Sequence, residues 1–341
     1  MPEAEKDAIN IKGSGATAKG DSMAIETPYL TPLLKEDRPI WIMGVHDVLS
    51  AKIAEHVGFD AVGVQSLQLA FVHGQPDIGV ITPDATLELC RKIRGAINIP
   101  IVVDFEQGFG EPYASVHWMH EFERAGVAAV HIDDYGLPYK CPFIPPHVMS
   151  IEPMDQTADK IRAMANEKLD ERFMVIGRPG TYVGRVHKDE ESRRADWLRR
   201  AEEYQKAGSD AIMAICWTVE HAKWFRSQID GTMMTIRTLG TEVKADRVQY
   251  SSDMMDLSTD DLYELGYQLQ IEPSTMIGVA TNAMLKALRH EKETGKISSL
   301  REEHGNLYDL LDMWMNVPEV RRIRETYVQA DFTGLGEEKD L

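Results

Sequence analysis

Short apolar runs alternate with longer amphipathic segments along the chain between residues 29 and 290. Nearly every residue of each run is hydrophobic, which is typical of parallel strands covered on both faces. The segments between them repeat apolar residues at helical spacing, as Val116, Met119 and Phe122 do in "ASVHWMHEFERAG". The strand-like runs are "PIWIMGV" from 39, "DAVGVQS" from 60, "IPIVVDFE" from 99, "AAVHIDD" from 128, "FMVIGRP" from 173, "DAIMAICW" from 210 and "YQLQIEP" from 267.

One further strand is expected between residues 230 and 252, where "TMMTIRT" and "DRVQYSS" compete. The second is favoured here, and the first is interpreted as part of a helical insertion. Eight strand–helix units then follow one another, which predicts an α/β fold of the (β/α)8 TIM-barrel type rather than an open doubly wound sheet.

The chain divides into three expected parts. Residues 1–28 are small, polar and glycine-bearing, and are predicted to form a flexible arm. Residues 29–290 form the catalytic barrel, and residues 291–341 form a helical extension that ends in an acidic tail. The extension is longer than one barrel helix requires, so packing on a neighbouring subunit is a reasonable interpretation.

The net charge of −18 argues against nucleic acid or an anionic membrane as a partner, but leaves a small anionic substrate open. No apolar run reaches the roughly 20 residues of a membrane span, and the N-terminus lacks the apolar core of a secretory signal. Cys90, Cys141 and Cys216 form neither a disulfide framework nor a metal-binding spacing. A reducing cytoplasm is therefore expected.

Polar side chains follow the expected strands at their C-terminal ends, where barrel active sites form. Asp104 and Glu106 lie two residues apart on one strand, so they should point the same way. With Asp133 on the next strand they would repel one another unless a cation lay among them, and oxygen ligands suit Mg²⁺ or Mn²⁺. Alternatively, each carboxylate caps the helix that follows it.

Arg178 leaves a strand directly into a Pro-Gly turn. It could hold a substrate carboxylate or phosphoryl group, balance the acidic cluster, or do both. Cys141 follows the fourth strand in a proline-rich loop, and the neighbouring Lys140 would favour its thiolate. A single cysteine is more often an inert small hydrophobe, so both roles stay open for Cys141.

Five separated motifs together resemble the isocitrate lyase/phosphoenolpyruvate mutase superfamily, over roughly residues 38 to 290. They are "GVHDVLSAKIAEHVGFDAVGV", "GQPDIGVIT", "IPIVVDFEQGFG", "HIDDYGLPYKC" and "LYELGYQLQIEP", and they occur in the order of that family. The resemblance implies a Mg²⁺-dependent barrel that acts on 2-oxo and 2-hydroxy acids through enolate-like intermediates. It also implies a homotetramer in which C-terminal helices are exchanged.

The resemblance also assigns expected roles to residues. Asp77, Asp104, Glu106 and Asp133 match the acidic metal-site positions, of which the last three are the expected ligands. Cys141, Arg178 and Asp77 form the expected catalytic set, with the cysteine as general acid on a gating loop. The expected substrate-binding residues are Gln65, Ser66, Leu67, Lys140, Arg178 and Ser274.

Departures from the family pattern leave the substrate open. Glu106 replaces the usual aspartate and Asp133 the usual glutamate, and Pro142-Phe143 replaces glycine-histidine after the cysteine. The cysteine itself favours the (methyl)isocitrate lyase-like branch, since phosphonopyruvate mutases carry asparagine there. The leading hypothesis is a Mg²⁺-dependent lyase that cleaves a C–C bond in a 2-hydroxy or 2-oxo di- or tricarboxylic acid. Alternatives are phosphonopyruvate mutase or hydrolase chemistry, oxaloacetate hydrolysis or decarboxylation, and a non-catalytic metabolite-binding protein.

Overall fold

A computed structural model describes residues 26–137, 141, 149–182, 187–237, 252–300 and 305–328. Eight parallel strands form a closed barrel in the order β1 to β8, which confirms the predicted fold class. The strands are β1 (Ile40–Val45), β2 (Ala61–Val64), β3 (Ile101–Asp104), β4 (Ala129–Asp133), β5 (Met174–Arg178), β6 (Ala211–Ala214), β7 (Met233–Ile236) and β8 (Leu269–Glu272).

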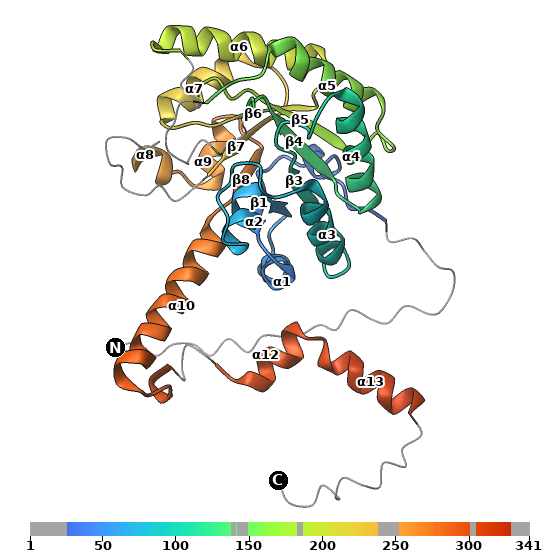
Figure 1. Cartoon of the computed structure of the whole chain (residues 1–341), viewed down its shortest axis with the longest axis vertical. Coiled ribbons are helices and arrows are strands. Elements are labelled where there is room, and N and C mark those ends of the chain that lie inside the picture. Colours follow the sequence, from blue (N-terminus) through green and yellow to red (C-terminus); the bar gives the residue numbers. More distant parts are fainter. Residues whose placement is uncertain are drawn as a thin grey trace, which may run out of the picture.

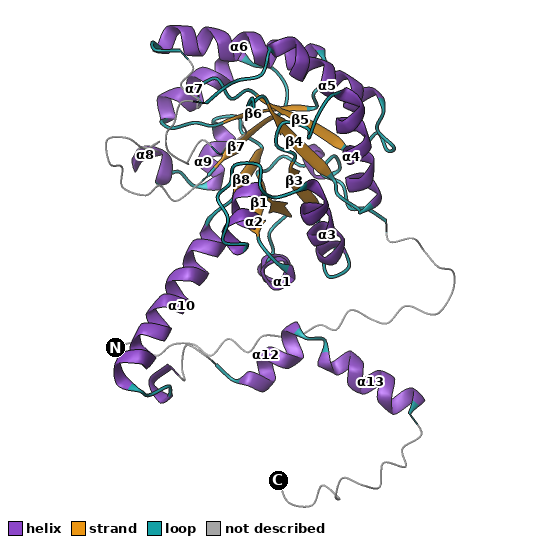
Figure 2. Cartoon of the chain, viewed as in Figure 1, coloured by secondary structure: helices purple, strands orange, loops and turns teal. Residues whose placement is uncertain are grey.

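Helices surround this barrel, as Figures 1 and 2 show. They are α1 (Val48–Val57), α2 (Ser66–Val72), α3 (Pro83–Arg94), α4 (Pro112–Arg124), α5 (Met154–Asn166), α6 (Glu190–Lys206), α7 (Val219–Gln228), α8 (Ser252–Met255) and α9 (Thr259–Glu264). Short 3₁₀ turns occur at Leu33–Lys35 and Ser298–Leu300. On the predicted face of α4, Met119 and Phe122 are fully buried.

The seventh strand differs from the prediction. β7 (Met233–Ile236) comes from "TMMTIRT", so the preference for "DRVQYSS" was wrong. Methionine is a good helix former in isolation, but all four residues are buried, and β7 pairs with both β6 and β8. Tertiary pairing thus overrides local propensity. Residues 246–251 lie outside the described residues, and Ser252 begins α8.

Because side chains alternate in direction along each strand, the core has an inner and an outer layer. Inward-facing side chains such as Ile42, Val102 and Ile176 fill the barrel, while outward-facing ones such as Val62 and Val103 pack beneath the helices. Glycine lets strands approach closely on the inside of the wall. A Cβ at Gly44 would lie 2.6 Å from the Pro273 backbone, and one at Gly63 would lie 2.7 Å from Ile271 Cδ1.

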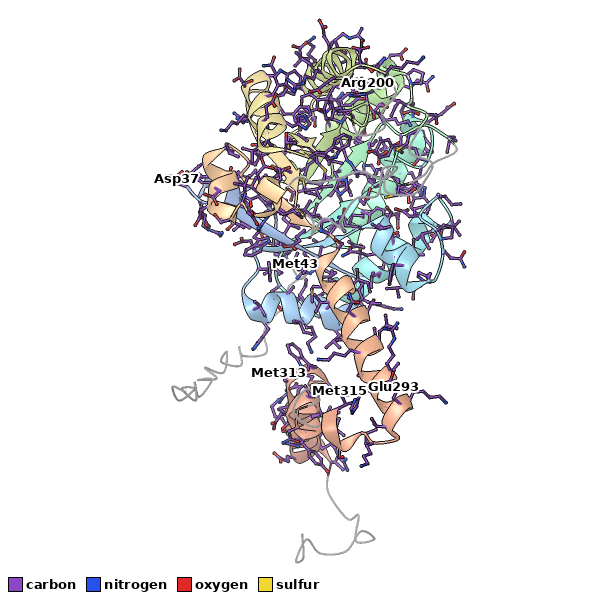
Figure 3. The ribbon with its side chains drawn as sticks, turned by 90° about the vertical axis from the view of Figure 1, so that its left-hand side faces the viewer. Asp37, Met43, Arg200, Glu293, Met313 and Met315 are labelled. Atoms are coloured by element: carbon purple, nitrogen blue, oxygen red, sulfur yellow. The ribbon has the colours of Figure 1, made fainter. Side chains whose placement is uncertain are left out.

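The chain leaves the barrel through α10 (Thr275–Thr294), followed by α12 (Leu307–Trp314) and α13 (Val317–Tyr327). Figure 3 shows these helices projecting away from the barrel, with Glu293, Met313 and Met315 far from Arg200. None of the three helices buries a residue. One tie back to the barrel is the Lys52 ammonium, which donates to the Trp314 carbonyl at 2.6 Å.

The predicted division of the chain at residues 28 and 290 stays a prediction, because residues 1–25 and 329–341 lie outside the described residues. Within the part that the structure describes, no helix combines the length and apolar character needed to cross a membrane.

Candidate active site

Charged side chains converge inside the barrel at the C-terminal ends of β3, β4 and β5. Asp104, Asp133 and Arg178 each occupy an inward-facing position, because they follow in alternation from Val102, Ala129 and Ile176 in the inner core. Each of the three side chains is at least nine-tenths buried. The strand ends therefore bring together groups that lie far apart in the sequence.

Glu106 reaches this cluster by a route that the sequence argument did not foresee. β3 ends at Asp104, so the premise that Glu106 shares a strand with it was wrong. The Glu106 backbone turns into the left-handed region with φ of +45°, which non-glycine residues seldom adopt. Two hydrogen bonds hold the turn: Glu106 N donates to Asp104 Oδ1 at 3.1 Å, and Asp133 N donates to Glu106 O at 2.8 Å.

Ser66 joins two of the acids. Its hydroxyl lies 3.2 Å from Asp77 Oδ2 and 3.2 Å from Asp104 Oδ2. Asp77 lies beyond α2 and is buried, so the α2–α3 connection supplies an acid that does not come from a strand end. The backbone of Cys141 donates to the Asp77 carbonyl at 2.9 Å, and its thiol hydrogen-bonds the Asp77 side chain. Cys141 is itself buried.

Arg178 provides the positive charge at the cluster. Its Nη1 lies 3.9 Å from Asp104 Oδ2 and 3.8 Å from Asp133 Oδ2. The guanidinium also lies over the Tyr135 ring, 5.3 Å from the ring centroid. Since both distances are near the limit for a salt bridge, Arg178 offsets negative charge in the cluster but forms no close ion pair with either acid.

His131 belongs to the site, although the sequence argument did not single it out. It faces inward one alternation below Asp133, and its Nδ1 lies 3.7 Å from Asp104 Oδ1. Its Nε2 lies 3.0 Å from Gln65 Oε1. Burial lowers the pKa of His131 to about 4, so the imidazole is neutral at pH 7. The inward period of residues 129, 131 and 133 was the signal that would have found it.

Burial and mutual repulsion raise the pKa of three of the acids. Desolvation, with Asp104, Asp133 and Asp77 adding repulsion, raises the pKa of Glu106 to about 9. Desolvation and Asp104 raise the pKa of Asp77 to about 6, against the lowering effect of Ser66 and Cys141. Burial also raises the pKa of Asp133 although Arg178 opposes it. A site of this kind favours a bound cation.

The carboxylates of the cluster suit a Mg²⁺ ion that keeps most of its water ligands. No three His, Cys, Asp or Glu residues of the described part are grouped as a ready first coordination sphere. Mg²⁺ commonly takes only one or two carboxylates directly, and fills its octahedron with water and substrate oxygens. Asp133 Oδ2 is buried and has no hydrogen-bond partner within the described residues, so one oxygen in the cluster is available to a cation or its water.

Helix capping does not explain the acids. The N-caps of α2, α3, α4 and α5 are Gln65, Thr82, Glu111 and Pro153, and none of these four caps makes a side-chain capping bond. The four carboxylates at the C-terminal mouth of the barrel are those of Asp77, Asp104, Glu106 and Asp133. None of them is needed as a cap for the helix that follows it.

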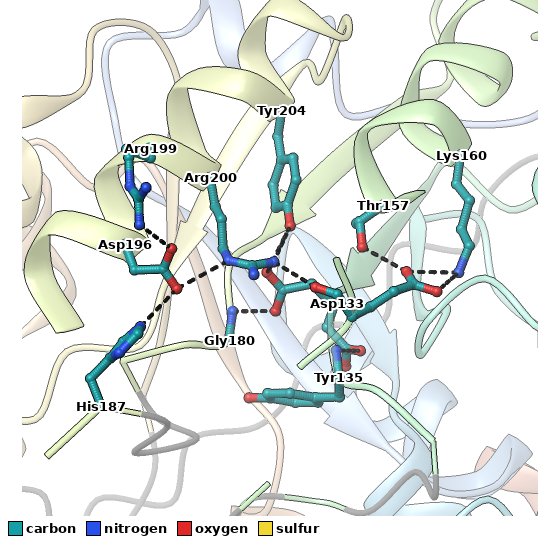
Figure 4. A network of polar contacts seen from close by, with 12 residues as sticks. Asp133, Tyr135, Thr157, Lys160, Gly180, His187, Asp196, Arg199, Arg200 and Tyr204 are labelled. Atoms are coloured by element: carbon teal, nitrogen blue, oxygen red, sulfur yellow. Dashed lines mark hydrogen bonds and ion pairs between the residues drawn. The ribbon is translucent and has the colours of Figure 1, made fainter. Parts of the chain in front are cut away.

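Asp134 has a structural role outside the mouth. Figure 4 shows its partners Arg200, Tyr204 and Gly180 within a network of polar contacts. Its Oδ2 accepts from Tyr204 at 2.7 Å and lies 3.1 Å from Arg200 Nη1, while Oδ1 accepts from Gly180 N at 2.6 Å. These three partners come from α6 and from the turn after β5.

Not all of the remaining residues predicted to bind substrate contact the acidic cluster. Gln65 and Ser66 contact the cluster as described, whereas Leu67 is half-buried on α2 and Ser274 is half-buried at the start of α10. Lys140 and Pro142-Phe143 lie outside the described residues. Gln68, which the sequence argument passed over, donates from its side chain to the Pro273 carbonyl and joins α2 to the end of β8.

A (β/α)8 barrel with buried acids beside Arg178 at its C-terminal mouth is the architecture of a barrel enzyme. The chain matches the phosphoenolpyruvate phosphomutase family over residues 30–291, and it belongs to that family.

The curated relatives of this chain include two proteins named as lyases. The chain is 28% identical over 301 residues to 2,3-dimethylmalate lyase of Eubacterium barkeri, covering 86% of this chain and 96% of that one. It is 27% identical over 264 residues to 2-methylisocitrate lyase of Halalkalibacterium halodurans, covering 77% and 81%. The fold is similar to phosphoenolpyruvate phosphomutase from Streptomyces platensis subsp. rosaceus, with a TM-score of 0.78, 21% identity and coverage of 88% and 98%.

Proposed function

We propose that this protein is a carbon–carbon lyase that cleaves a 2-hydroxy or 2-oxo di- or tricarboxylic acid through an enolate-like intermediate, with Mg²⁺ or Mn²⁺ as cofactor. The observation that carries the proposal is the buried cluster of Asp77, Asp104, Glu106 and Asp133, with Arg178 beside Asp104 and Asp133 and a thiol beside Asp77. The two curated relatives, both named as lyases, support it.

Asp104, Glu106 and Asp133 are the residues that would hold the metal, directly or through water. When bound, Mg²⁺ supplies electrostatic stabilisation of the negative charge that develops on the substrate oxygens. Arg178 lies beside Asp104 and Asp133, where it can bind a substrate carboxylate. His131 stays neutral beneath the acids, so it adds no charge that would compete with a cation.

Asp77 and Cys141 supply the proton transfers. Asp77 is the proposed base, because a pKa of about 6 lets it accept the hydroxyl proton near neutral pH. The C–C bond then breaks, its electron pair stays on the departing carbon, and the Cys141 thiol protonates that carbon. The hydrogen bond between the two side chains lets Asp77 return its proton to the thiolate, which completes the cycle.

A panel of 2-hydroxy and 2-oxo di- and tricarboxylates tests this function. With Mg²⁺ present, we expect release of a 2-oxo acid, detected by coupled reduction with a dehydrogenase, and loss of that release in EDTA. Phosphonopyruvate with phosphorus NMR is the comparison arm. Phosphorus–carbon cleavage or rearrangement without any C–C cleavage in the panel would assign the protein to the other reaction class.

We also infer a homotetramer and a reducing cytoplasm. Helices α10, α12 and α13 bury no residue in the single chain, yet they expose Leu288 at 63%, Leu307 at 54% and Tyr327 at 65%. Faces of this kind are typical of surfaces that another copy covers. Cys90, Cys141 and Cys216 are all free thiols, which suits a reducing compartment.

A further inference from the structure

The two terminal nitrogens of Arg178 face different partners. Nη1 is directed at the acids, and lies 3.9 Å from Asp104 Oδ2 and 3.8 Å from Asp133 Oδ2. Nη2 lies 3.5 Å from the Tyr135 hydroxyl, and the central carbon of the guanidinium lies over the Tyr135 ring, 5.3 Å from the centroid. Tyr135 thus contacts the arginine both through its ring and through its oxygen.

Several contacts fix the position of Tyr135. Its backbone amide donates to Asp133 Oδ1 at 3.2 Å, and an isolated antiparallel bridge joins its backbone to Ile151. Its side chain is 1% exposed and packs with Met149 and Ile151 in a small cluster separate from the main core. The ring is therefore held against the segment that follows β4.

Gly180 leaves room for this ring. A Cβ at Gly180 would lie 2.7 Å from Tyr135 Cδ1 and closer still to Cε1, so any other residue there would displace the ring or the turn. The Gly180 amide donates to Asp134 Oδ1 at 2.6 Å, which ties the turn after β5 to the end of β4 (Figure 4). Since Arg178 is two residues before Gly180, the turn that follows the arginine packs directly on the Tyr135 ring.

A phenol can direct an arginine without neutralising it. Close bidentate pairing with a carboxylate uses two N–H groups of the guanidinium, and Tyr135 engages one of the two terminal nitrogens. A phenol is uncharged near pH 7, so it leaves the charge of Arg178 available to an anion, and the ring face adds a cation–π attraction. These contacts account for the distances of 3.8 and 3.9 Å that separate Arg178 from the two acids.

From these contacts we infer that Tyr135 is a positioning residue, which holds the Arg178 guanidinium away from Asp104 and Asp133 and directs it to a substrate carboxylate. The inference rests on the proposed function, in which Arg178 binds that carboxylate. Without the ring, the guanidinium would close on the two acids, and a substrate would have to compete with them for it. Tyr135 therefore acts on the affinity for substrate more than on the proton transfers.

Calorimetry with oxalate and Mg²⁺ on the full chain tests this inference, because oxalate is a small dicarboxylate whose binding requires no turnover. Tyr135→Leu should weaken oxalate binding roughly tenfold, since both the cation–π contact and the hydroxyl are lost. Tyr267→Leu is the matched control: it removes another fully buried tyrosine, from the segment before β8 at the opposite end of the barrel. It should lower the unfolding midpoint and keep the oxalate affinity. Unchanged affinity in Tyr135→Leu, or an equal loss in both variants, overturns the inference.

Gly180→Ala approaches the same ring from the turn after β5, and should also weaken oxalate binding. Its methyl group would lie 2.8 Å from Asp134 Oδ1 as well, so a double-mutant cycle with Tyr135→Leu isolates the part that acts through the ring. Leucine lacks the Cε1 atom that this methyl meets first, so the combined loss should be smaller than the product of the single losses. A combined loss equal to that product overturns the inference. Should Tyr135→Leu fail to fold, unchanged affinity in Gly180→Ala overturns it alone.

Binding and turnover separate this inference from the proposed function. With the substrate found in the panel, Tyr135→Leu should raise KM about tenfold and change kcat much less, because Arg178 binds a carboxylate alike before and during the reaction. Weakened oxalate binding in a protein that cleaves no acid of the panel supports the role of Tyr135 but removes the lyase function. C–C cleavage with an unchanged KM in Tyr135→Leu supports the lyase function but removes the role of Tyr135.

Discussion

Asp133 and Asp134 are adjacent in the chain, yet their side chains lie on opposite faces of the barrel wall. Asp133 faces inward to Arg178, whereas Asp134 faces outward to Arg200, Tyr204 and the Gly180 backbone. Both carboxylates are fully buried. Asp133 thus belongs to the candidate active site, whereas Asp134 connects the end of β4 to α6.

Arg200→Met should destabilise the protein without a direct effect on chemistry. Removing the guanidinium leaves Asp134 buried with only Tyr204 and Gly180, and the loss of one partner of a buried pair costs about 3 kcal/mol. Urea unfolding followed by circular dichroism measures the change. Lys92→Met removes an exposed helical ion pair with Glu88 and should leave the unfolding midpoint unchanged.

Cys141→Ser should lower kcat by about 100-fold while KM changes little, because a general acid contributes at least that factor to a proton transfer. The measurement is steady-state kinetics on the substrate found in the panel. Cys90→Ala is the control, since Cys90 is buried in α3 and burial raises its pKa far above neutrality. Undiminished turnover in Cys141→Ser would remove the cysteine from the mechanism.

Glu106→Gln should stabilise the metal-free protein, and more so at high pH. Because the folded pKa is about 9 and the ordinary value is 4.5, the folded state holds a proton that the unfolded state releases across this window. The free energy of unfolding of the natural protein therefore falls as pH rises from about 4.5 to 9. Glutamine removes that fall, which we expect to amount to about 5 kcal/mol by pH 8.

Urea titrations in EDTA at several pH values between 5 and 9 measure this effect. Glu293→Gln on the exposed surface of α10 provides the matched control, and should follow the natural protein at every pH. An unfolding free energy that shows the same pH slope in Glu106→Gln as in the natural protein would contradict the assignment of the raised pKa to Glu106.

Leu288→Glu tests the proposed homotetramer, which we expect it to dissociate. Leu288 is 63% exposed on α10, and in the proposed tetramer a carboxylate there would lie against apolar side chains of another copy. Size-exclusion chromatography with light scattering should report a smaller species than the natural protein at the same concentration. Leu169→Glu, on an exposed turn before β5, should keep the natural mass; a tetramer in both variants would exclude α10 from the interface.

Most of the barrel could be predicted because most of its strand segments are largely apolar, which is typical of parallel strands covered on both faces. The seventh strand could not, since "TMMTIRT" and "DRVQYSS" are equally short and partly polar. Pairing with β6 and β8 decides between them, and such pairing is not visible locally.

The candidate site was predictable where strand ends carry the residue. Asp104, Asp133 and Arg178 follow directly from that rule. Glu106 was expected in the cluster on the premise that it shares a strand with Asp104. A turn with left-handed backbone at Glu106 places it there instead. Asp77 comes from a connection between helices, and its role was assigned by resemblance to a family. The neutral state of His131 depends on complete burial, which a sequence does not reveal.

The hydrogen bond from Cys141 N to the Asp77 carbonyl gives the proposed proton donor an anchor outside its own segment. Any displacement of Cys141 away from Asp77 must either break this bond or draw the α2–α3 connection along with it. In the proposed mechanism, the position of the acid therefore depends on a stretch of chain that contributes no strand to the barrel. We expect substitutions in that stretch to slow the proton transfer while every group at the strand ends stays in place.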